Sequence, residues 1–253
     1  AKPASGLIST LGWAAYLACS WTWCIGMFLP VLLVRDYGIW GFVVFAVPNG
    51  IGAAAMGWVL TRRSSLASVA AHRHACAAFS IVTIAFQITF FAILLPKLGD
   101  VLADQSPRRI SAISIVIAAI VAAVATPAGF ARRSIAVAIW IVSAASLIAV
   151  LIRAGWPTLP QQPARPETDL AFLAPVCAFG FLLCPYLDLT FHRARQAADR
   201  AGPAAFGLGF GVLFLAMILG TLSYITPALA WLESRQAPAL ALAIPLGIHL
   251  PAS

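Results

Sequence analysis

The sequence predicts an all-α fold, a polytopic bundle of about seven membrane-spanning helices integral to the cell (inner) membrane. Of its 253 residues, 62% are hydrophobic and only 9% are charged, whereas soluble domains carry about 25% charged residues. The formal net charge is +8, but the basic residues form short clusters between apolar runs rather than a patch or stripe. The expected partner is therefore the lipid bilayer and not a nucleic acid.

Seven apolar stretches are long enough to cross a bilayer, which takes about 20 helical residues. They cover residues 8–34, 39–61, 75–95, 109–129, 134–153, 170–190 and 205–231. A last apolar run, 237–251, is shorter and is interrupted by prolines. We expect it to form a half-helix or a re-entrant segment, since proline breaks helical hydrogen bonding.

The basic residues of the loops predict the orientation. Nine Lys and Arg residues fall on the N-terminal side of the predicted bundle and seven on the other, and an excess of Lys and Arg marks the cytoplasmic side. We therefore expect a cytoplasmic N-terminus. The sequence divides into a five-span unit (1–153), a Pro-rich extracytoplasmic loop (154–169), a two-span unit (170–232) and an apolar terminal segment (233–253).

Gly and Pro interrupt the first and the sixth predicted spans. The first contains Cys24-Ile25-Gly26-Met27-Phe28-Leu29-Pro30, and the sixth contains Gly180-Phe181-Leu182-Leu183-Cys184-Pro185. A break in a membrane helix frees backbone groups that only protein or a polar cavity can satisfy. Paired breaks in corresponding positions indicate a transporter binding site near the bilayer midplane.

A Gly-Phe-rich segment follows each interrupted span. Gly41-Phe42-Val43-Val44-Phe45 opens the second span, and Gly209-Phe210-Gly211-Val212-Leu213-Phe214 lies early in the seventh. The two pairs of spans are offset by five, an odd number, so the copies must cross the membrane in opposite directions. This arrangement predicts an inverted-topology repeat.

These features resemble the five-plus-five inverted-repeat fold of the amino acid–polyamine–cation superfamily, which includes the sodium:solute symporters. The stretch from Cys24 to Pro30 is similar to the unwound segment of that family's first core helix. The resemblance implies a solute site between the interrupted helices and a sodium ion or a proton as coupling ion. The family has ten core helices, and this chain supplies about seven. Either a partner subunit or a second copy completes the bundle, or the fold is reduced and serves another use.

Polar groups inside the predicted spans, together with groups beside the breaks, are the candidate ligand-binding residues, because polar groups in lipid are costly and mark function. They are Ser20, Thr22, Trp23, Gly26, Asn49, Gln87, Gly180 and Tyr186. Each polar side chain equally fits an interhelical hydrogen bond. Trp21 and Trp23 fit either packing or a cavity wall.

Asp188 is the acidic residue that lies clearly inside a predicted span. One interpretation makes it the site of ion or proton coupling. The other pairs it with His192, which lies four residues later on the same helical face, in an ion pair at the membrane interface.

The five cysteines lack metal-ligand or redox spacing, and hydrolase, zinc-protease and phosphate-loop motifs are absent from the sequence. We expect no enzyme activity, no metal site and no resident cofactor. The predicted function is transporter-like binding of a small solute or ion between two broken helices. The alternative is a non-transporting membrane subunit that scaffolds a larger complex or binds lipid or pigment.

Overall fold

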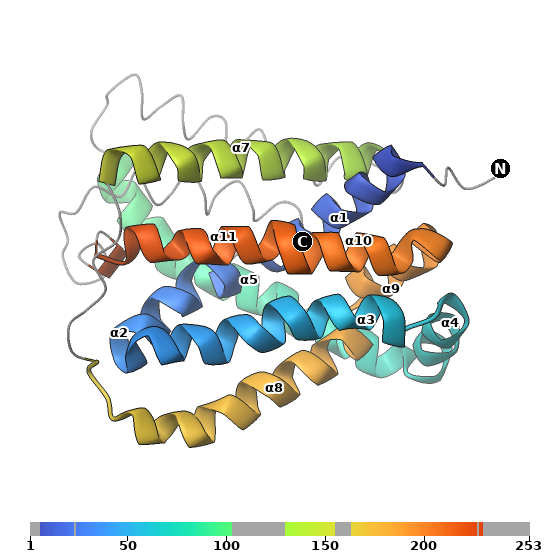
Figure 1. Ribbon diagram of the computed structural model, residues 1–253, viewed down its shortest axis with the longest axis horizontal. Coiled ribbons are helices and arrows are strands. Elements are labelled where there is room, and N and C mark those ends of the chain that lie inside the picture. Colours follow the sequence, from blue (N-terminus) through green and yellow to red (C-terminus); the bar gives the residue numbers. More distant parts are fainter. Residues whose placement is uncertain (1–5, 23, 103–129, 155–162, 227, 230–253) are drawn as a thin grey trace.

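The computed structural model describes residues 6–22, 24–102, 130–154, 163–226 and 228–229. These residues form helices and turns, with no strand among them. The predicted all-α class is therefore confirmed for this part of the chain. The long helices lie side by side in an elongated bundle, with α4 and α9 at one end (Figure 1).

The N-terminal part contains α1 (Leu7–Thr22), α2 (Cys24–Ala46), the π-helix η1 (Val47–Gly52) and α3 (Ala53–Val59). The backbone turns sharply at Gly38, where φ is 64° and ψ is −155°. Glycine adopts this left-handed φ without the steric penalty that a Cβ imposes. The turn separates the predicted first and second spans where the sequence analysis placed their boundary.

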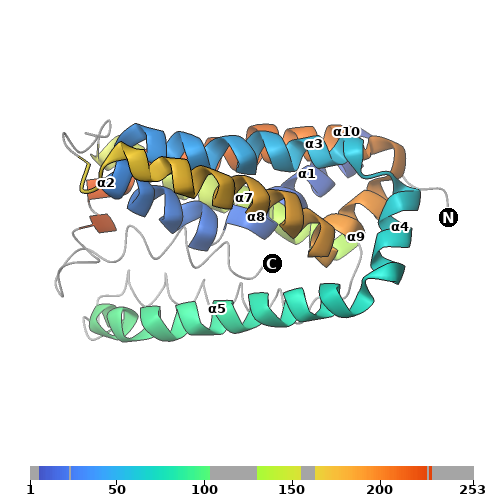
Figure 2. The ribbon, with the colours of Figure 1, turned by 90° about the horizontal axis from the view of Figure 1, so that it is seen from below.

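The next elements are α4 (Arg62–Ala71), α5 (Arg73–Leu102) and α7 (Phe130–Ala154). The Thr61 hydroxyl accepts from the Ser64 backbone N–H and the Ser64 hydroxyl from the Thr61 N–H, which forms a capping box at the start of α4. α4 and the first part of α5 are bent by 86°. α4 therefore crosses the end of the bundle before α5 runs back along its side (Figure 2).

The C-terminal part begins with a short 3-10 turn, followed by a long helix and a short one, and then by a composite helix. These are η2 (Glu167–Asp169), α8 (Leu170–Leu187), α9 (Leu189–Ala198), η3 (Asp199–Ala201), α10 (Gly202–Leu208), the π-helix η4 (Gly209–Phe214), α11 (Leu215–Gly220) and η5 (Thr221–Tyr224). The chain turns a second time at Asp199, whose φ is 46°.

The helix through α3 and the helix through α10 pack against each other in antiparallel directions (Figure 1). An added Cβ at Gly57 would lie 2.6 Å from Phe206 Cβ, and one at Gly211 would lie 3.9 Å from Ala54 Cβ. Between these two contacts the residue number decreases along one helix and increases along the other, as expected for antiparallel helices. Glycine at position 57 thus allows the two backbones to approach closely.

An aromatic cluster fills the core where α1, α9 and α10–η4 meet. The rings of Phe191 and Phe210 are stacked, with centroids 5.0 Å apart. Trp21 meets the edge of Phe191 at 5.3 Å. Phe206 and Phe214 are also fully buried, and such pairs add about 0.5–1.5 kcal/mol beyond simple burial.

Two helical stretches of the described chain, Gly26–Val59 and Leu189–Tyr224, are long and apolar enough to cross a membrane. A third results if α4 and the start of α5 are counted as one span. Each of the first two contains one of the sharp turns, at Gly38 or at Asp199. Beyond each turn about 20 helical residues remain, the length that crosses the hydrocarbon core.

Three predicted features lie wholly or partly outside the described residues. They are the fourth span at 109–129, residues 155–162 of the Pro-rich loop and the apolar run at 237–251.

Candidate functional site

The predicted interruption of the first span at Gly26 and Pro30 does not occur, because α2 runs as a helix from Cys24 through both residues. Trp23, between α1 and α2, lies outside the described residues. The sixth predicted span is not broken at Gly180, because α8 continues through it to Leu187. A glycine weakens a helix by only about 1 kcal/mol, and the break comes instead at Asp188, in the β region with ψ 111°.

One hydrogen bond joins α1 to the junction between α8 and α9. The indole Nε1–H of Trp21, next to the end of α1, donates to Asp188 Oδ2 at 3.3 Å. The other carboxylate oxygen, Oδ1, accepts the Thr190 backbone N–H at 2.8 Å and so caps α9. Asp188 therefore lies between α8 and α9 and also contacts α1.

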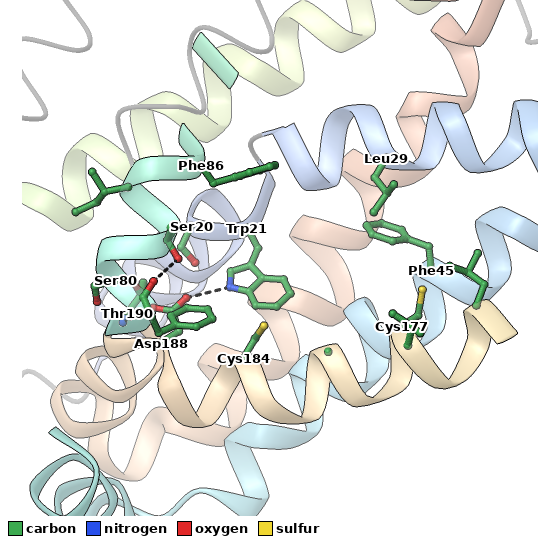
Figure 3. A pocket seen from close by; sticks show the side chains of 16 residues that line it. Ser20, Trp21, Leu29, Phe45, Ser80, Phe86, Cys177, Cys184, Asp188 and Thr190 are labelled. Carbon is green, nitrogen blue, oxygen red and sulfur yellow. Dashed lines mark hydrogen bonds between the residues drawn. The ribbon is translucent and has the colours of Figure 1, made fainter. Parts of the chain in front are cut away.

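A cavity of about 540 Å³ opens beside this contact. Its size falls within the range of about 300–1,000 Å³ that is typical of small-molecule sites. The walls come from α1, α2, α5, α8 and the start of α9, and most lining side chains are apolar (Figure 3). The aromatic members are Trp21, Phe45, Phe79 and Phe86.

The polar groups of the cavity are mainly acceptors. The hydroxyls of Ser20, Ser80 and Thr83 donate to carbonyls of their own helices, at 2.7, 3.0 and 2.9 Å, which leaves their oxygen lone pairs available. None of the sixteen lining residues is Lys, Arg or His. With the Asp188 carboxylate, this lining favours a ligand that is cationic or donates hydrogen bonds, because a negative ligand would meet uncompensated charge.

Three of the predicted site residues line this cavity: Ser20, Gly180 and Asp188. Trp21 lines it as well and also packs against Phe191 and Phe210 in the core, so both roles expected of a tryptophan in this span apply to it. An added Cβ at Gly180 would meet nothing within 4 Å. Gly180 thus contributes open space to the site rather than a break in the helix.

Three other predicted site residues do not line the cavity. An added Cβ at Gly26 would lie 2.9 Å from Trp21 O and 3.1 Å from Phe214, so this glycine permits helix packing. Asn49 is fully buried in η1, where its amide donates to Phe45 O at 2.7 Å. The Tyr186 side chain is 40% exposed, outside the lining. Close packing accounts for Gly26, whereas Asn49 has its amide N–H bonded locally and its buried Oδ1 without a hydrogen-bond partner among the described residues.

The remaining candidates cannot be placed. Trp23 lies outside the described residues, as do the side chains of Thr22 and Gln87.

His192 belongs to a separate buried network and does not pair with Asp188. Its Nε2 lies 2.9 Å from the Tyr186 carbonyl and its Nδ1 lies 2.9 Å from Ser65 Oγ. A carbonyl only accepts, so Nε2 carries the proton. Gln196 Nε2 donates to Ser65 Oγ at 3.0 Å, so this hydroxyl contacts both the imidazole and the amide. We call Ser65, His192 and Gln196 the α4–α9 network.

This network corrects the interface ion pair expected from the spacing of Asp188 and His192. Asp188 is the N-cap of α9 and has an extended backbone with ψ 111°, so its side chain leaves the helix in a different direction from that of His192. The carboxylate therefore turns toward α1 and the imidazole toward α4. Helical spacing predicts a shared face only when both residues belong to one helix.

Sequence reasoning missed Ser80 and Thr190 as cavity residues and missed the bond from Trp21 to Asp188. Ser80 lies one turn before Thr83 on α5, and this hydroxyl spacing is the only signal that the sequence offered. The Trp21 contact joins residues 167 positions apart, for which a single sequence carries no local pattern.

Among the described residues, no group of three or more His, Cys, Asp and Glu side chains is arranged to hold a metal ion. Comparisons of the chain with protein-family models, with curated proteins and with solved structures found no match.

Proposed function

We propose that this chain is a multi-pass integral membrane protein with a transporter-like core, which binds a small solute or ion in the cavity beside Asp188. The observation that carries the proposal is the hydrogen bond from Trp21 to Asp188, because it joins α1 to the junction of α8 and α9 at the wall of the cavity. In this proposal, seven spans cross the membrane with the N-terminus in the cytoplasm.

Exposed apolar side chains support the membrane placement. Large apolar residues are exposed on the outer helices α3, α5, α7 and α8, among them Trp58, Ile81, Val82, Ile148, Phe172 and Phe179. Soluble monomers rarely expose contiguous apolar patches of more than a few hundred Å². A lipid environment accounts for these side chains without further partners.

The two π-helices support the inverted repeat. In the first unit, η1 begins at Val47, eight residues after the Ile39 that follows the sharp turn. In the second, η4 begins at Gly209, seven residues after the start of α10 at Gly202. π-Helices make up well under 1% of residues in proteins. Their similar placement in two antiparallel helices is what an inverted repeat predicts.

A binding screen with a cavity-filling variant tests the solute site. The purified protein in mild detergent is screened for thermal stabilisation by amino acids, protonated amines, sugars and nucleosides. A ligand present at 100 times its Kd stabilises the native state by about 2.7 kcal/mol. Gly180→Phe should abolish the stabilisation, since its ring would occupy the cavity.

Gly52→Phe is the matched control, because a Cβ at Gly52 also meets nothing within 4 Å and Gly52 does not line the cavity. It should retain full ligand stabilisation. Equal stabilisation of wild type and Gly180→Phe by the same compound would place the site elsewhere. A panel that stabilises neither wild type nor Gly52→Phe would contradict solute binding.

Coupling to a sodium ion or a proton is tested at Asp188. Proteoliposomes with an imposed sodium or proton gradient should accumulate the stabilising compound. Asp188→Asn keeps the size of the side chain but removes its charge, so it should abolish the dependence on the gradient. Trp21→Phe removes the hydrogen bond to the carboxylate and part of the indole packing but keeps the charge of Asp188, so it should weaken that dependence less.

A non-transporting membrane subunit is the second candidate, and the predominantly apolar lining of the cavity favours it. Such a subunit would hold a lipid tail or a pigment there, or scaffold a larger complex. Mild-detergent extraction distinguishes the two. Co-migrating subunits, bound lipid in mass spectra or visible absorbance favour the second candidate, and gradient-driven uptake by the chain alone favours the first.

A further inference from the structure

Four exposed arginines gather at the end of the bundle formed by α4, α9 and η3. They are Arg62, Arg63, Arg193 and Arg200, and a fifth exposed arginine, Arg73, begins α5 between the exposed His72 and His74. Asp199 is the acidic residue of these segments, and its own backbone carbonyl accepts from the buried Arg195. The surface is therefore strongly positive.

The opposite end of the bundle has a different charge balance. There Arg35 lies 2.7 Å from Asp36 and Arg165 lies 3.8 Å from the same carboxylate. Residues 164 and 165 also donate their backbone N–H groups to the carbonyls of Arg35 and Asp36. These are the ion pairs found among the described residues, and the arginines of α4, α9 and η3 take part in none of them.

Hydrogen bonds hold the arginine-bearing helices α4 and α9 to each other and to the end of α3. Arg62 Nε donates to the Gln196 carbonyl at 3.3 Å. The α4–α9 network joins the same two helices through buried side chains, and Arg195 binds the Leu60 carbonyl at the end of α3. The exposed guanidinium groups therefore belong to helices that are joined to the bundle by hydrogen bonds.

The direction of α4 also matches a membrane surface. It crosses the end of the bundle at 86° to the start of α5 (Figure 2), so it lies along the bilayer plane when α5 spans the bilayer. Leu66, one turn after Arg63, is 45% exposed. Apolar and basic side chains on one short helix are typical of an interfacial helix, whose apolar groups enter the headgroup layer.

We propose that this surface, formed by the exposed arginines of α4, α9 and η3, binds the phosphate groups of anionic phospholipids in the adjacent leaflet. Guanidinium groups pair with phosphate oxygens through two parallel hydrogen bonds. Each basic residue near an anionic leaflet changes affinity by about fivefold. The inference rests on the membrane placement proposed above, although it does not depend on the solute cavity.

The test measures lipid binding by the full-length protein in uncharged detergent. Phosphatidylglycerol or phosphatidylcholine is titrated in, and bound lipid is followed by native mass spectrometry and by the melting temperature. Phosphatidylglycerol should bind more tightly, and its advantage should fall between 0.1 M and 0.5 M NaCl as screening increases. Arg63→Gln with Arg193→Gln should weaken phosphatidylglycerol binding by about 25-fold, as two contacts of about fivefold each.

Arg165→Gln, at the opposite end, is the matched control and should leave lipid binding unchanged. Equal binding of both lipids, or wild-type affinity in the double variant, would overturn the proposal. Equal stabilisation by inorganic phosphate would also overturn it, because the site would then take free phosphate. A protein that stays monodisperse without detergent would instead overturn the membrane placement itself, whatever the arginine variants show.

Discussion

Gly57 offers a quantitative test of the close packing between α3 and α10. An alanine there places its Cβ 2.6 Å from Phe206 Cβ and 3.0 Å from Pro203 Cα. Real Cβ atoms do not approach this closely, so one of the two helices must shift. Overpacking of this kind costs about 1–3 kcal/mol. The helix gains about 0.8–1.0 kcal/mol from the better propensity of alanine, so that gain must be subtracted by a control.

Gly52→Ala is that control, because Gly52 lies on the same helix in a right-handed helical conformation and its Cβ would meet nothing within 4 Å. It should gain stability from propensity alone. The difference between the two variants then reports overpacking, about 1–3 kcal/mol or ~2–12 °C for a chain of this size. Differential scanning fluorimetry in detergent measures it. If Gly57→Ala melts as high as Gly52→Ala, the described approach of α3 to α10 is wrong.

Three further predictions concern contacts between distant segments. Ala54→Cys with Gly211→Cys, in a background without other cysteines, should form a disulfide under mild oxidation, because the two Cβ positions lie 3.9 Å apart. Ala55→Cys with Gly211→Cys should not, and equal crosslinking of both pairs on gels would refute the antiparallel register. Tyr224→Phe removes the hydroxyl that donates to an α2 carbonyl at 2.9 Å. It should lower stability in thermal melts by about 0.6–1.7 kcal/mol, and an unchanged melting temperature would contradict that bond. Ser65→Ala removes the hydroxyl that contacts both His192 Nδ1 and the Gln196 amide in the α4–α9 network. It should cost about 1–3 kcal/mol, whereas Ser65→Thr, which keeps the hydroxyl, should lose less in the same assay.

Composition and hydropathy predicted the helical class and the position of several helix ends. The gap between the first two apolar stretches contains the turn at Gly38, and the apolar stretch at 170–190 corresponds closely to α8. These features depend on local properties, namely apolar length and the ability of glycine to adopt a positive φ. They are accessible from one sequence for that reason.

The candidate site was only partly predictable. Ser20, Gly180 and Asp188 line the cavity, but Gly26 and Asn49 serve packing and local hydrogen bonding instead. A glycine that permits close approach and a glycine that opens a cavity look alike in a sequence. Only the neighbours from other helices distinguish them, and those neighbours lie far away along the chain.

α4 has a consequence for the size of whatever the cavity holds. Its ten residues span about 15 Å at 1.5 Å per residue. It connects the end of α3 to the start of α5, and α5 supplies one wall of the cavity (Figure 2). The length of α4 thus sets the distance between α5 and the rest of the bundle. A longer or shorter α4 would change the width of the cavity without altering any of the residues that line it.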